Sequence, residues 1–225
     1  MLPSVRQLFP IDQSDVDPMA CYAAEQRDRS PWVLVNMIAT IDGATAIEGR
    51  SGGLGGPADK VVFAAIRSIA DVILVGAGTV RAENYGPPRV PARLVIVSAS
   101  LDLAPTAKVF SDGYRPIVVT TSDADPTRRQ ALEAVADVIV AGDTRVDLLA
   151  ALTHFSGVVV CEGGPSLNGQ LIGEGLVDEI CLTVAPLLAS GDSSRVAHGP
   201  APAQPRRMQL RHILEADNCL FLRYS

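Results

Sequence analysis

The sequence predicts an α/β protein with a central mixed sheet that is mostly parallel, helices on both faces and an antiparallel hairpin at the C-terminal end. Three observations carry this prediction. Short apolar runs alternate with segments of helical periodicity between Trp32 and Leu188. Most of the apolar runs end in glycine or another small residue, which is typical of parallel strands in α/β proteins. The segments 208–214 and 219–225 flank the short turn Glu215–Asn218 and form the expected hairpin.

Each expected element has a local signal of its own. Apolar runs bounded by glycine, proline or small residues predict the strands 32–39, 71–78, 92–100, 115–121, 137–142, 157–164 and 177–188. Apolar residues at helical spacing predict the helices 57–70, 79–84, 125–136, 144–155 and 165–176. Pro57 and Pro165 suit the first turn of their helices, where a missing N–H leaves no bond unmade. The segment 187–207 is rich in Pro, Gly, Ser and Ala and predicts a long loop.

Residues 1–30 differ from the rest of the chain because they are polar and contain proline. We expect them to form an arm packed on the body, and we expect residues 31–225 to form a single domain. A chain of 225 residues with 48% hydrophobic content is long enough for one sizeable core.

Composition and charge narrow the classes of function. The formal net charge is −6 and no run of Lys or Arg stands out, which argues against a nucleic-acid partner. No apolar run reaches the ~20 residues of a membrane span, and the N-terminus lacks a signal-peptide pattern, so we expect a cytoplasmic protein without a membrane partner. The four cysteines form no C-x-x-C pair and the three histidines are scattered, so we expect no metal site.

Ligands of open α/β sheets bind beyond the carboxyl ends of the strands, and four strand ends carry suitable residues here. The first is followed by Asp42-Gly43, which suits a tight turn, and by a glycine-rich segment, 49–56, that precedes a helix. This composition fits a surface loop as well as a phosphate-binding loop. At the second, Gly76 and Gly78 precede a short helix. Arg81 replaces the third glycine of a Rossmann fingerprint, which leaves an anion site and a simple turn as alternatives.

The third and fourth strand ends also allow two interpretations each. Ser98 and Ser100 follow the third, either as ordinary loop residues or as contacts to a ribose or its phosphate. At the fourth, "VVVCEGGPSLNG", the strand ends on Glu162, and two glycines then allow close backbone approach. The helix that begins at Pro165 offers free N–H groups and a dipole that favour an anion such as pyrophosphate. Glu162 either faces the same crevice or caps this helix.

Three motifs in this order and spacing resemble the pyrimidine reductase of riboflavin biosynthesis: "MIATIDGATA", "IRSIADVILVGAGTVRAEN" and "VVVCEGGPSLNGQLIGEGLVDEICLTVAPLL". In many bacteria this reductase is the C-terminal half of a bifunctional deaminase–reductase. The resemblance implies the dihydrofolate reductase-like fold, a three-layer sandwich, together with NADPH as hydride donor and usually a homodimer. The implied reaction reduces 5-amino-6-(5-phosphoribosylamino)uracil to the ribitylamino form by hydride transfer, without a metal.

The resemblance also implies roles for individual residues. Ser51, Arg67 and Glu162 match positions that contact the substrate, and Arg89 is a candidate second arginine for its phosphate. The matched cofactor positions are Ala46, Gly76, Thr79, Glu83, Ser98, Gly163, Gly164, Pro165, Ser166, Leu167 and Asn168. The nearest candidates for the 2′-phosphate of NADPH are Ser98, Ser100 and Arg81.

The proton source is left open between Glu162, Asp42 and a bound water.

Three departures from the family pattern fall on the substrate side. Ala44 stands where the family usually has Lys or Arg, the loop 51–57 lacks a frequent Trp, and 83–88 replaces the D-D-P-x-L-T pattern, with Glu83 in place of Asp. A reductase of a dihydropterin or dihydrofolate-like heterocycle is therefore an alternative hypothesis. A nucleotide-binding module without turnover is the second alternative, and it depends on Ala44.

Overall fold

The computed structural model describes residues 3–23 and 27–225, so 1–2 and 24–26 of the predicted arm lie outside the described residues. In the described part, one sheet of ten strands has the order β1-β9-β10-β8-β2-β7-β3-β4-β5-β6. The strands are β1 Arg6–Phe9, β2 Trp32–Thr40, β3 Val72–Gly76, β4 Arg93–Val97, β5 Ile117–Thr120, β6 Asp137–Val140, β7 Val158–Cys161, β8 Glu179–Ala185, β9 Leu210–Ala216 and β10 Cys219–Tyr224. The helices are α1 Pro18–Ala23, α2 Pro57–Ser68, α3 Ala77–Ala82, the 3₁₀ helix η1 Lys108–Gly113, α4 Pro126–Glu133, α5 Leu148–Leu152 and α6 Pro165–Gly173.

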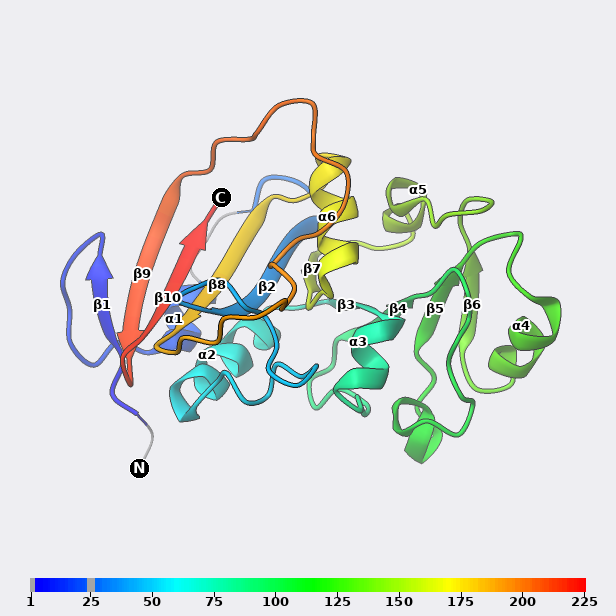
Figure 1. Ribbon diagram of the computed structural model, residues 1–225, viewed down its shortest axis with the longest axis horizontal. Coiled ribbons are helices and arrows are strands. Elements are labelled where there is room, and N and C mark those ends of the chain that lie inside the picture. The colour runs from blue at the N-terminus through cyan, green and yellow to red at the C-terminus, as the bar shows by residue number, and fades with distance from the viewer. Residues whose placement is uncertain (1–2, 24–26) are drawn as a thin grey trace.

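The direction of the strands divides the sheet into two parts. From β8 to β6, neighbours in the sheet pair in parallel, whereas β10 pairs antiparallel with both β8 and β9, and β1 pairs antiparallel with β9. The predicted mixed, mostly parallel sheet with an antiparallel C-terminal hairpin is confirmed. Figure 1 shows the antiparallel strands gathered at one end and the parallel strands running to α4 at the other.

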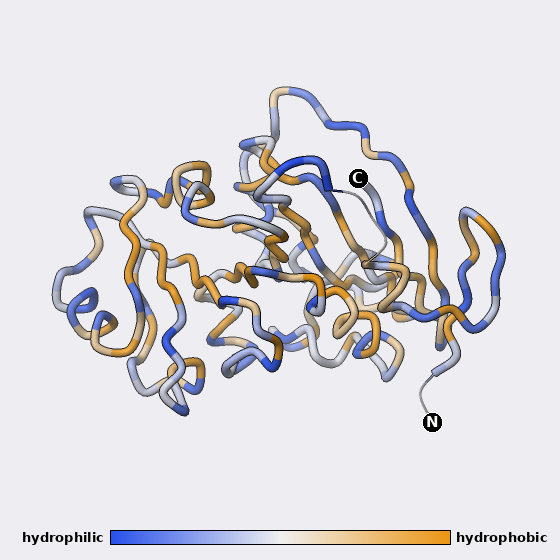
Figure 2. The backbone as a smooth tube through the Cα atoms, turned by 180° about the vertical axis from the view of Figure 1, so that it is seen from behind, coloured by the Kyte–Doolittle hydropathy of each residue, from blue (hydrophilic) through white to orange (hydrophobic). Residues whose placement is uncertain are grey.

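Helices cover both faces of the sheet, which gives three layers. One core cluster joins α5 and α6 to one face, and two further clusters join α1, α2, α3, α4 and η1 to the other face. Side chains of β3 alternate between these clusters: Val72 and Leu74 point to the first face, and Ile73 and Val75 to the second. The strands accordingly run mostly orange in Figure 2, while many outer turns are blue or white.

Helix α2 begins at a proline and carries two rows of side chains that face different parts of the molecule. Gly56 precedes Pro57, whose fixed φ suits the first helical position. The apolar stripe, Ala58, Val62, Ala65 and Ile66, is buried against the sheet. A second stripe at four-residue intervals, namely Asp59, Phe63 and Arg67, lies beside it, and its first two members line the site described below.

The N-terminal residues add a strand that the sequence did not predict. β1 pairs with β9 and extends the antiparallel end of the sheet. Its four residues are mostly exposed and show no apolar alternation, so no strand signal exists in the sequence. Tyr22 of α1 is 1% exposed and packs in the same cluster as Leu34 of β2.

A buried ion pair lies under α1. Arg223 Nε donates to Glu179 Oε1 at 2.7 Å, and Trp32 Nε1 donates to Glu179 Oε2 at 2.9 Å. Arg223 Nη1 also reaches the carbonyl oxygen of Cys21 at 3.2 Å, which ties the helix to the sheet. The His212 ring packs edge-on against Tyr22, with ring centroids 4.9 Å apart.

The predicted helix at 144–155 is shorter in the structure. The Asp147 carboxylate accepts the backbone N–H of Ala150, so α5 begins at Leu148, and it ends at Leu152. The predicted short helix at 79–84 begins two residues earlier, at Ala77.

The predicted loop between β8 and β9 crosses α6, as Figure 1 shows. The carbonyl oxygen of Ser194 accepts bonds from the N–H and the hydroxyl of Thr45, at 3.1 and 2.8 Å. Asn168 Nδ2 donates to Val196 O at 2.8 Å, and the His198 N–H donates to Pro165 O at 2.9 Å. The loop therefore closes one side of the carboxyl edge of the parallel strands.

Among the described residues, no helix is both long enough and apolar enough to cross a membrane.

Candidate active site

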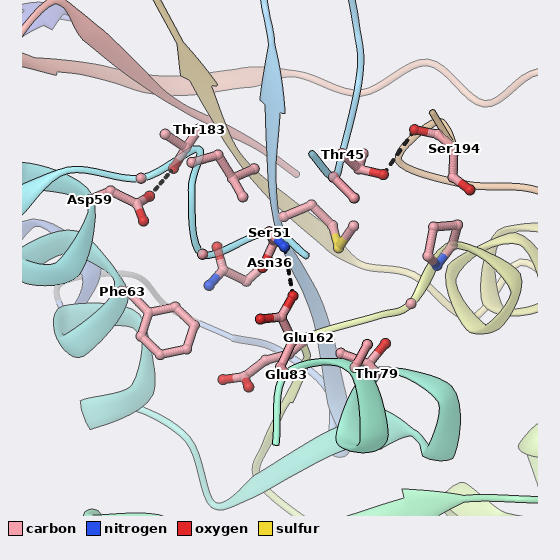
Figure 3. A pocket seen from close by; sticks show the side chains of 18 of the residues that line it. Asn36, Thr45, Ser51, Asp59, Phe63, Thr79, Glu83, Glu162, Thr183 and Ser194 are labelled. Atoms are coloured by element: carbon pink, nitrogen blue, oxygen red, sulfur yellow. Dashed lines mark hydrogen bonds between the residues drawn. The ribbon is translucent and has the colours of Figure 1, made fainter. Parts of the chain in front are cut away.

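A cavity of about 480 Å³ opens at the carboxyl edge of the parallel strands. Its walls come from α2, α3, the start of α6, strands β2 and β8 and the glycine-rich loop after β2. Figure 3 shows Asp59, Phe63 and Thr183 toward one end of the cavity, with Thr45, Ser194 and Thr79 toward the other.

The glycine pair at the end of β7 brings bare backbone to the cavity. The Gly163–Gly164 peptide is cis, and Gly163 has a φ of +80°, which favours glycine. A Cβ on Gly164 would lie 2.8 Å from Thr79 Oγ1, so a side chain there collides with α3. The Gly76 N–H donates to Gly163 O at 2.7 Å and fixes this turn to the end of β3.

The start of α6 is suited to an anion. Gly164 is its N-cap and offers no side-chain acceptor, so the N–H groups of the first turn are not capped by the preceding residue. Gly164 and Pro165 both line the cavity. Because the dipole of a helix places partial positive charge at this end, a phosphate group of a dinucleotide fits here.

Glu162 is held by three donors. Arg67 Nε and Nη2 donate to its two oxygens, each at 2.7 Å, and the Tyr85 hydroxyl donates to Oε2 at 2.7 Å. Two parallel N–H bonds to one carboxylate are the bidentate geometry of an ion pair. The Glu162 side chain is 3% exposed and that of Arg67 is 21% exposed. Burial, together with the Glu162 charge, raises the pKa of Tyr85 well above its ordinary value, so its hydroxyl stays a donor.

Arg67 also packs on aromatic rings. Its guanidinium carbon lies 4.4 Å from the centroid of the Phe63 ring and 5.9 Å from that of Tyr85. The ion pair and the ring contacts together fix Arg67 next to Phe63, Tyr85 and Glu162, which line the cavity, whereas Arg67 itself is not part of the wall.

Asp59 lies at the opposite end of the same helical stripe. Thr183 Oγ1 donates to its Oδ1 at 3.0 Å. Burial raises the pKa of Asp59, and the Thr183 bond and the Lys60 charge act against that increase. Asp59, Lys60 and Thr183 all line the cavity.

The structure brings seven of the predicted site residues to the cavity wall. These are Ala46, Ser51, Thr79, Glu83, Glu162, Gly164 and Pro165. Ser51 and Glu83 meet directly, because the Ser51 N–H donates to Glu83 Oε1 at 2.6 Å. This bond joins the loop after β2 to the segment after α3.

Asp42 lies outside the cavity wall. Its carboxylate accepts bonds from the Thr40 hydroxyl and from the N–H groups of Ser190 and Ala189, which lower its pKa to about 2. This arrangement fastens the loop after β8 to the turn after β2. As a proton source it stays a prediction, and the structure favours the fastening role. Arg89 is exposed and does not line the cavity.

Several predicted cofactor residues support the wall from behind. Gly76 and Gly163 hold the glycine turn, and Ser166 is exposed on the first turn of α6. Leu167 belongs to the core, and Asn168 is fully buried and bonds to the loop. The Ser98 hydroxyl is buried at the end of β4 without a hydrogen-bond partner in the described part of the chain.

Sequence reasoning missed several residues of the cavity wall. Asn36, Asp59, Phe63 and Thr183 line it, and none was predicted. The four-residue spacing of Asp59, Phe63 and Arg67 was a usable signal, because it places all three on one side of a helix. In the described ranges, no three His, Cys, Asp or Glu side chains lie close enough together to bind a metal ion.

Comparison with solved structures shows that the chain shares the fold of dihydrofolate reductase. The model of the RibD C-terminal domain matches residues 31–222, and the chain belongs to this family of pyrimidine reductases of riboflavin biosynthesis. The resemblance inferred from three sequence motifs is thereby confirmed.

Individual relatives agree with this assignment. The chain is 31% identical over 178 residues to the 2,5-diamino-6-ribosylamino-4(3H)-pyrimidinone 5′-phosphate reductase of Methanothermobacter thermautotrophicus, covering 73% of this chain and 82% of the relative. It is 30% identical to the riboflavin biosynthesis protein RibD of Mycobacterium tuberculosis, with 85% of this chain and 53% of the relative covered.

Solved structures show the same fold. A pyrimidine reductase-like protein from Corynebacterium diphtheriae superposes with a TM-score of 0.82 at 26% identity, covering 93% of this chain and 98% of the other. Dihydrofolate reductase from Enterococcus faecalis superposes with a TM-score of 0.51 at 12% identity, covering 86% and 95%, which shows the fold alone. The predicted dihydrofolate reductase-like sandwich is confirmed.

Proposed function

We propose that this chain is a cytoplasmic, NADPH-dependent reductase that converts the ribosylamino group of a phosphorylated aminopyrimidine to a ribitylamino group, with residues 31–225 as its catalytic domain. The observation that carries the proposal is the cavity, which has an uncapped helix start at one end and an aromatic, acidic helix face at the other. The matched family and the reductases named among its relatives support the reaction class.

The cofactor end of the cavity fits a dinucleotide. Gly164 has no room for a Cβ, and its backbone and Pro165 face the cavity. The first turn of α6 is placed to receive the pyrophosphate, with Thr79 across from it and Ala46 on the wall. When bound there, the nicotinamide supplies the hydride that reduces the sugar carbon of the open imine form.

The choice of NADPH over NADH is the finer part of the proposal. Arg81 Nη1 donates to the carbonyl oxygen of Asp102 at 2.6 Å, and Arg128 Nη1 donates to that of Ser100 at 3.1 Å. Both guanidinium groups thus lie at the loop that follows β4, where Ser98 is also found. We assign the 2′-phosphate to this loop, because two exposed arginines and nearby serine hydroxyls favour a dianion.

Glu162 serves as a positioning residue in this proposal. The three donors to its carboxylate come from Arg67 and Tyr85, so it orients both side chains at the substrate end. Arg67 bonds to Glu162 through Nε and Nη2, and we assign its Nη1 to the substrate phosphate, with Arg89 as a second contact. The imine nitrogen takes its proton from a bound water, since Asp42 lies outside the cavity and Glu162 is engaged.

A homodimer is the expected assembly, and an apolar sheet face supports it. Leu182 and Val184 of β8 lie opposite Leu222 and Leu220 of β10 and share one face with them. The other face of these strands carries the core residues packed under α1 and α2. Leu220 is 37% exposed, and no helix lies in front of β9 and β10 in Figure 1. A second copy would bury this face, and light scattering of the wild type and of Leu222→Glu tests it, with a dimer and a monomer as the expected results.

The deciding experiment follows the oxidation of NADPH with three candidate substrates in parallel. These are the aminopyrimidine ribosyl phosphate in its 2-amino form, the same compound in its uracil form, and dihydrofolate. Turnover with either pyrimidine and none with dihydrofolate supports the proposal. Turnover with dihydrofolate alone favours the heterocycle-reductase alternative, and saturable NADPH binding without any oxidation favours the non-catalytic module.

A further inference from the structure

The carboxylate of Asp59 is the one acidic group that α2 directs into the substrate end of the cavity. Asp59 and Phe63 are four residues apart, so they lie one turn apart on the same side of the helix, and both line the cavity. Figure 3 shows them on the side away from Thr79, which belongs to the cofactor end. A planar ring that stacks on Phe63 therefore presents its edge to Asp59.

Two neighbours fix the orientation of this carboxylate. Thr183 Oγ1 donates to Oδ1 at 3.0 Å, which anchors one oxygen to strand β8. The second oxygen lies against Gly55, where an added Cβ would come within 2.2 Å of Oδ2. Within the described residues, Oδ2 receives no hydrogen bond, so it is left for a donor on the ligand. The burial of this carboxylate raises its pKa, because a charge that is only partly solvated is disfavoured.

The two ring forms of the substrate class differ at the edge that meets such a group. In the 2-amino-pyrimidinone, the amino group on C2 and the N3–H are adjacent donors, and a carboxylate accepts both at once. In the uracil, a carbonyl oxygen replaces the amino group. The N3–H still donates to one carboxylate oxygen, but the other oxygen then faces an acceptor, which repels it and leaves it without a donor.

We propose that Asp59 is the specificity-determining residue of this reductase, and that it selects the 2-amino-pyrimidinone ring over the corresponding uracil. The inference rests on the proposed function, since it concerns the ring that the same cavity reduces. It places the reduction before the hydrolytic removal of the 2-amino group, so a deaminase must act on the product. Thr183 and Gly55 are positioning residues in this proposal.

The test compares kcat/KM for the two ring forms in the wild type and in Asp59→Asn. We expect the wild type to prefer the 2-amino form. The carboxamide keeps the size of the side chain but offers an N–H to the C2 carbonyl, so the preference should fall by about ten- to a hundredfold and shift toward the uracil. Glu83→Gln is the matched control, because it removes another cavity carboxylate and should lower both rates by the same factor.

A second variant reaches Asp59 without changing it. In Gly55→Ala the new Cβ displaces Oδ2, and we expect a loss of preference in the same direction. The affinity of Asp59→Asn for the cofactor shows whether that variant folds. If it does not fold, Gly55→Ala decides the question.

The outcomes separate the two proposals. If the wild type reduces neither ring form, the proposed function fails. If it reduces both but favours the uracil, or if Asp59→Asn lowers both rates equally, the reductase function stands and the role of Asp59 is overturned. A preference for the uracil that disappears in Lys60→Ala would assign the selection to Lys60, which also lines the cavity.

Discussion

Two buried Arg–Glu pairs of nearly identical geometry lie in regions with different tasks. In both, an arginine Nε lies 2.7 Å from a glutamate Oε1, and an aromatic side chain donates to the second oxygen. In both, the guanidinium also lies over an aromatic ring. The pair beside the cavity keeps Arg67 21% exposed, whereas the side chains of Arg223 and Glu179 under α1 are 1% and 0% exposed.

The difference in exposure decides what each pair does. Arg67 keeps part of its exposure next to Phe63, Tyr85 and Glu162, which line the cavity, so we assign the Arg67–Glu162 pair to the orientation of groups for binding. A charge closed off from solvent has only the protein to compensate it, so the Arg223–Glu179 pair fixes the antiparallel strands and α1 in one arrangement. The same residue types therefore serve function at one end of the sheet and architecture at the other.

The largest expected effect is the loss of stability when the Arg223–Glu179 pair is broken. Glu179→Gln removes the charge that compensates a buried guanidinium, and we expect the free energy of unfolding to fall by about 3–5 kcal/mol. Urea denaturation followed by tryptophan fluorescence measures the change. A loss below about 1 kcal/mol would show that the pair is dispensable.

Acid should lower the free energy of unfolding through His212, which lies in the same region. Burial lowers the pKa of His212 from 6.5 to about 4, and the Arg223 charge acts in the same direction. The unfolded chain therefore takes up the proton first, so stability is full above the ordinary pKa and falls by about 3 kcal/mol as the pH drops from 6.5 to about 4. His212→Phe keeps the contact with Tyr22 without a titrating group, and its stability should change less over this range in urea titrations at several pH values. Equal slopes for both proteins would contradict the assignment.

Changes in the Arg67–Glu162 pair should affect turnover rather than stability. Glu162→Gln loosens Arg67 and Tyr85, and we expect kcat to fall about a hundredfold while the affinity for NADPH stays nearly unchanged. Stopped-flow turnover and cofactor titration separate the two quantities, and Glu179→Gln is the matched control, with a stability loss but a kcat close to that of the wild type. A collapse of NADPH affinity in Glu162→Gln would make Glu162 a structural residue.

The smallest effect is expected at an exposed pair. Arg81 Nη1 lies 3.3 Å from Asp102 Oδ2, and the two side chains are 49% and 60% exposed. Arg81→Ala should change stability by less than about 1 kcal/mol but raise the KM for NADPH about tenfold, with no change for NADH. Parallel steady-state assays with both cofactors check this. A similar rise for NADH would remove Arg81 from recognition of the 2′-phosphate.

Most of the parallel half of the sheet was predictable, because its strands are continuous apolar runs that end in glycine or small residues. The antiparallel edge was only partly predictable. β1 has exposed side chains and acquires its structure from β9, so local sequence carries no sign of it. α5 is short because Asp147, which lies inside the predicted helix, caps its first turn. Tertiary packing, and not local sequence, determines that the helix begins there.

The candidate site divides in the same way. The glycine turn and Glu162 stand out in sequence because they interrupt a buried strand. Asp59 and Thr183 are 124 residues apart and meet only because β8 lies next to β2 and under α2. Glu179 and Arg223 likewise meet through the register of β8 and β10, which no local pattern encodes.

Helix α6 also constrains how this sequence is able to vary. Alanine normally stabilises a helix by about 1 kcal/mol relative to glycine, so drift should replace a mid-helix glycine readily. At Gly169, however, a methyl group would lie 2.1 Å from the carbonyl oxygen of His198, where the loop crosses. The gain in helix propensity is therefore out of reach unless the path of the loop changes in the same step. Position 169 and the backbone at 198–199 are therefore sterically coupled, so we expect them to change only together.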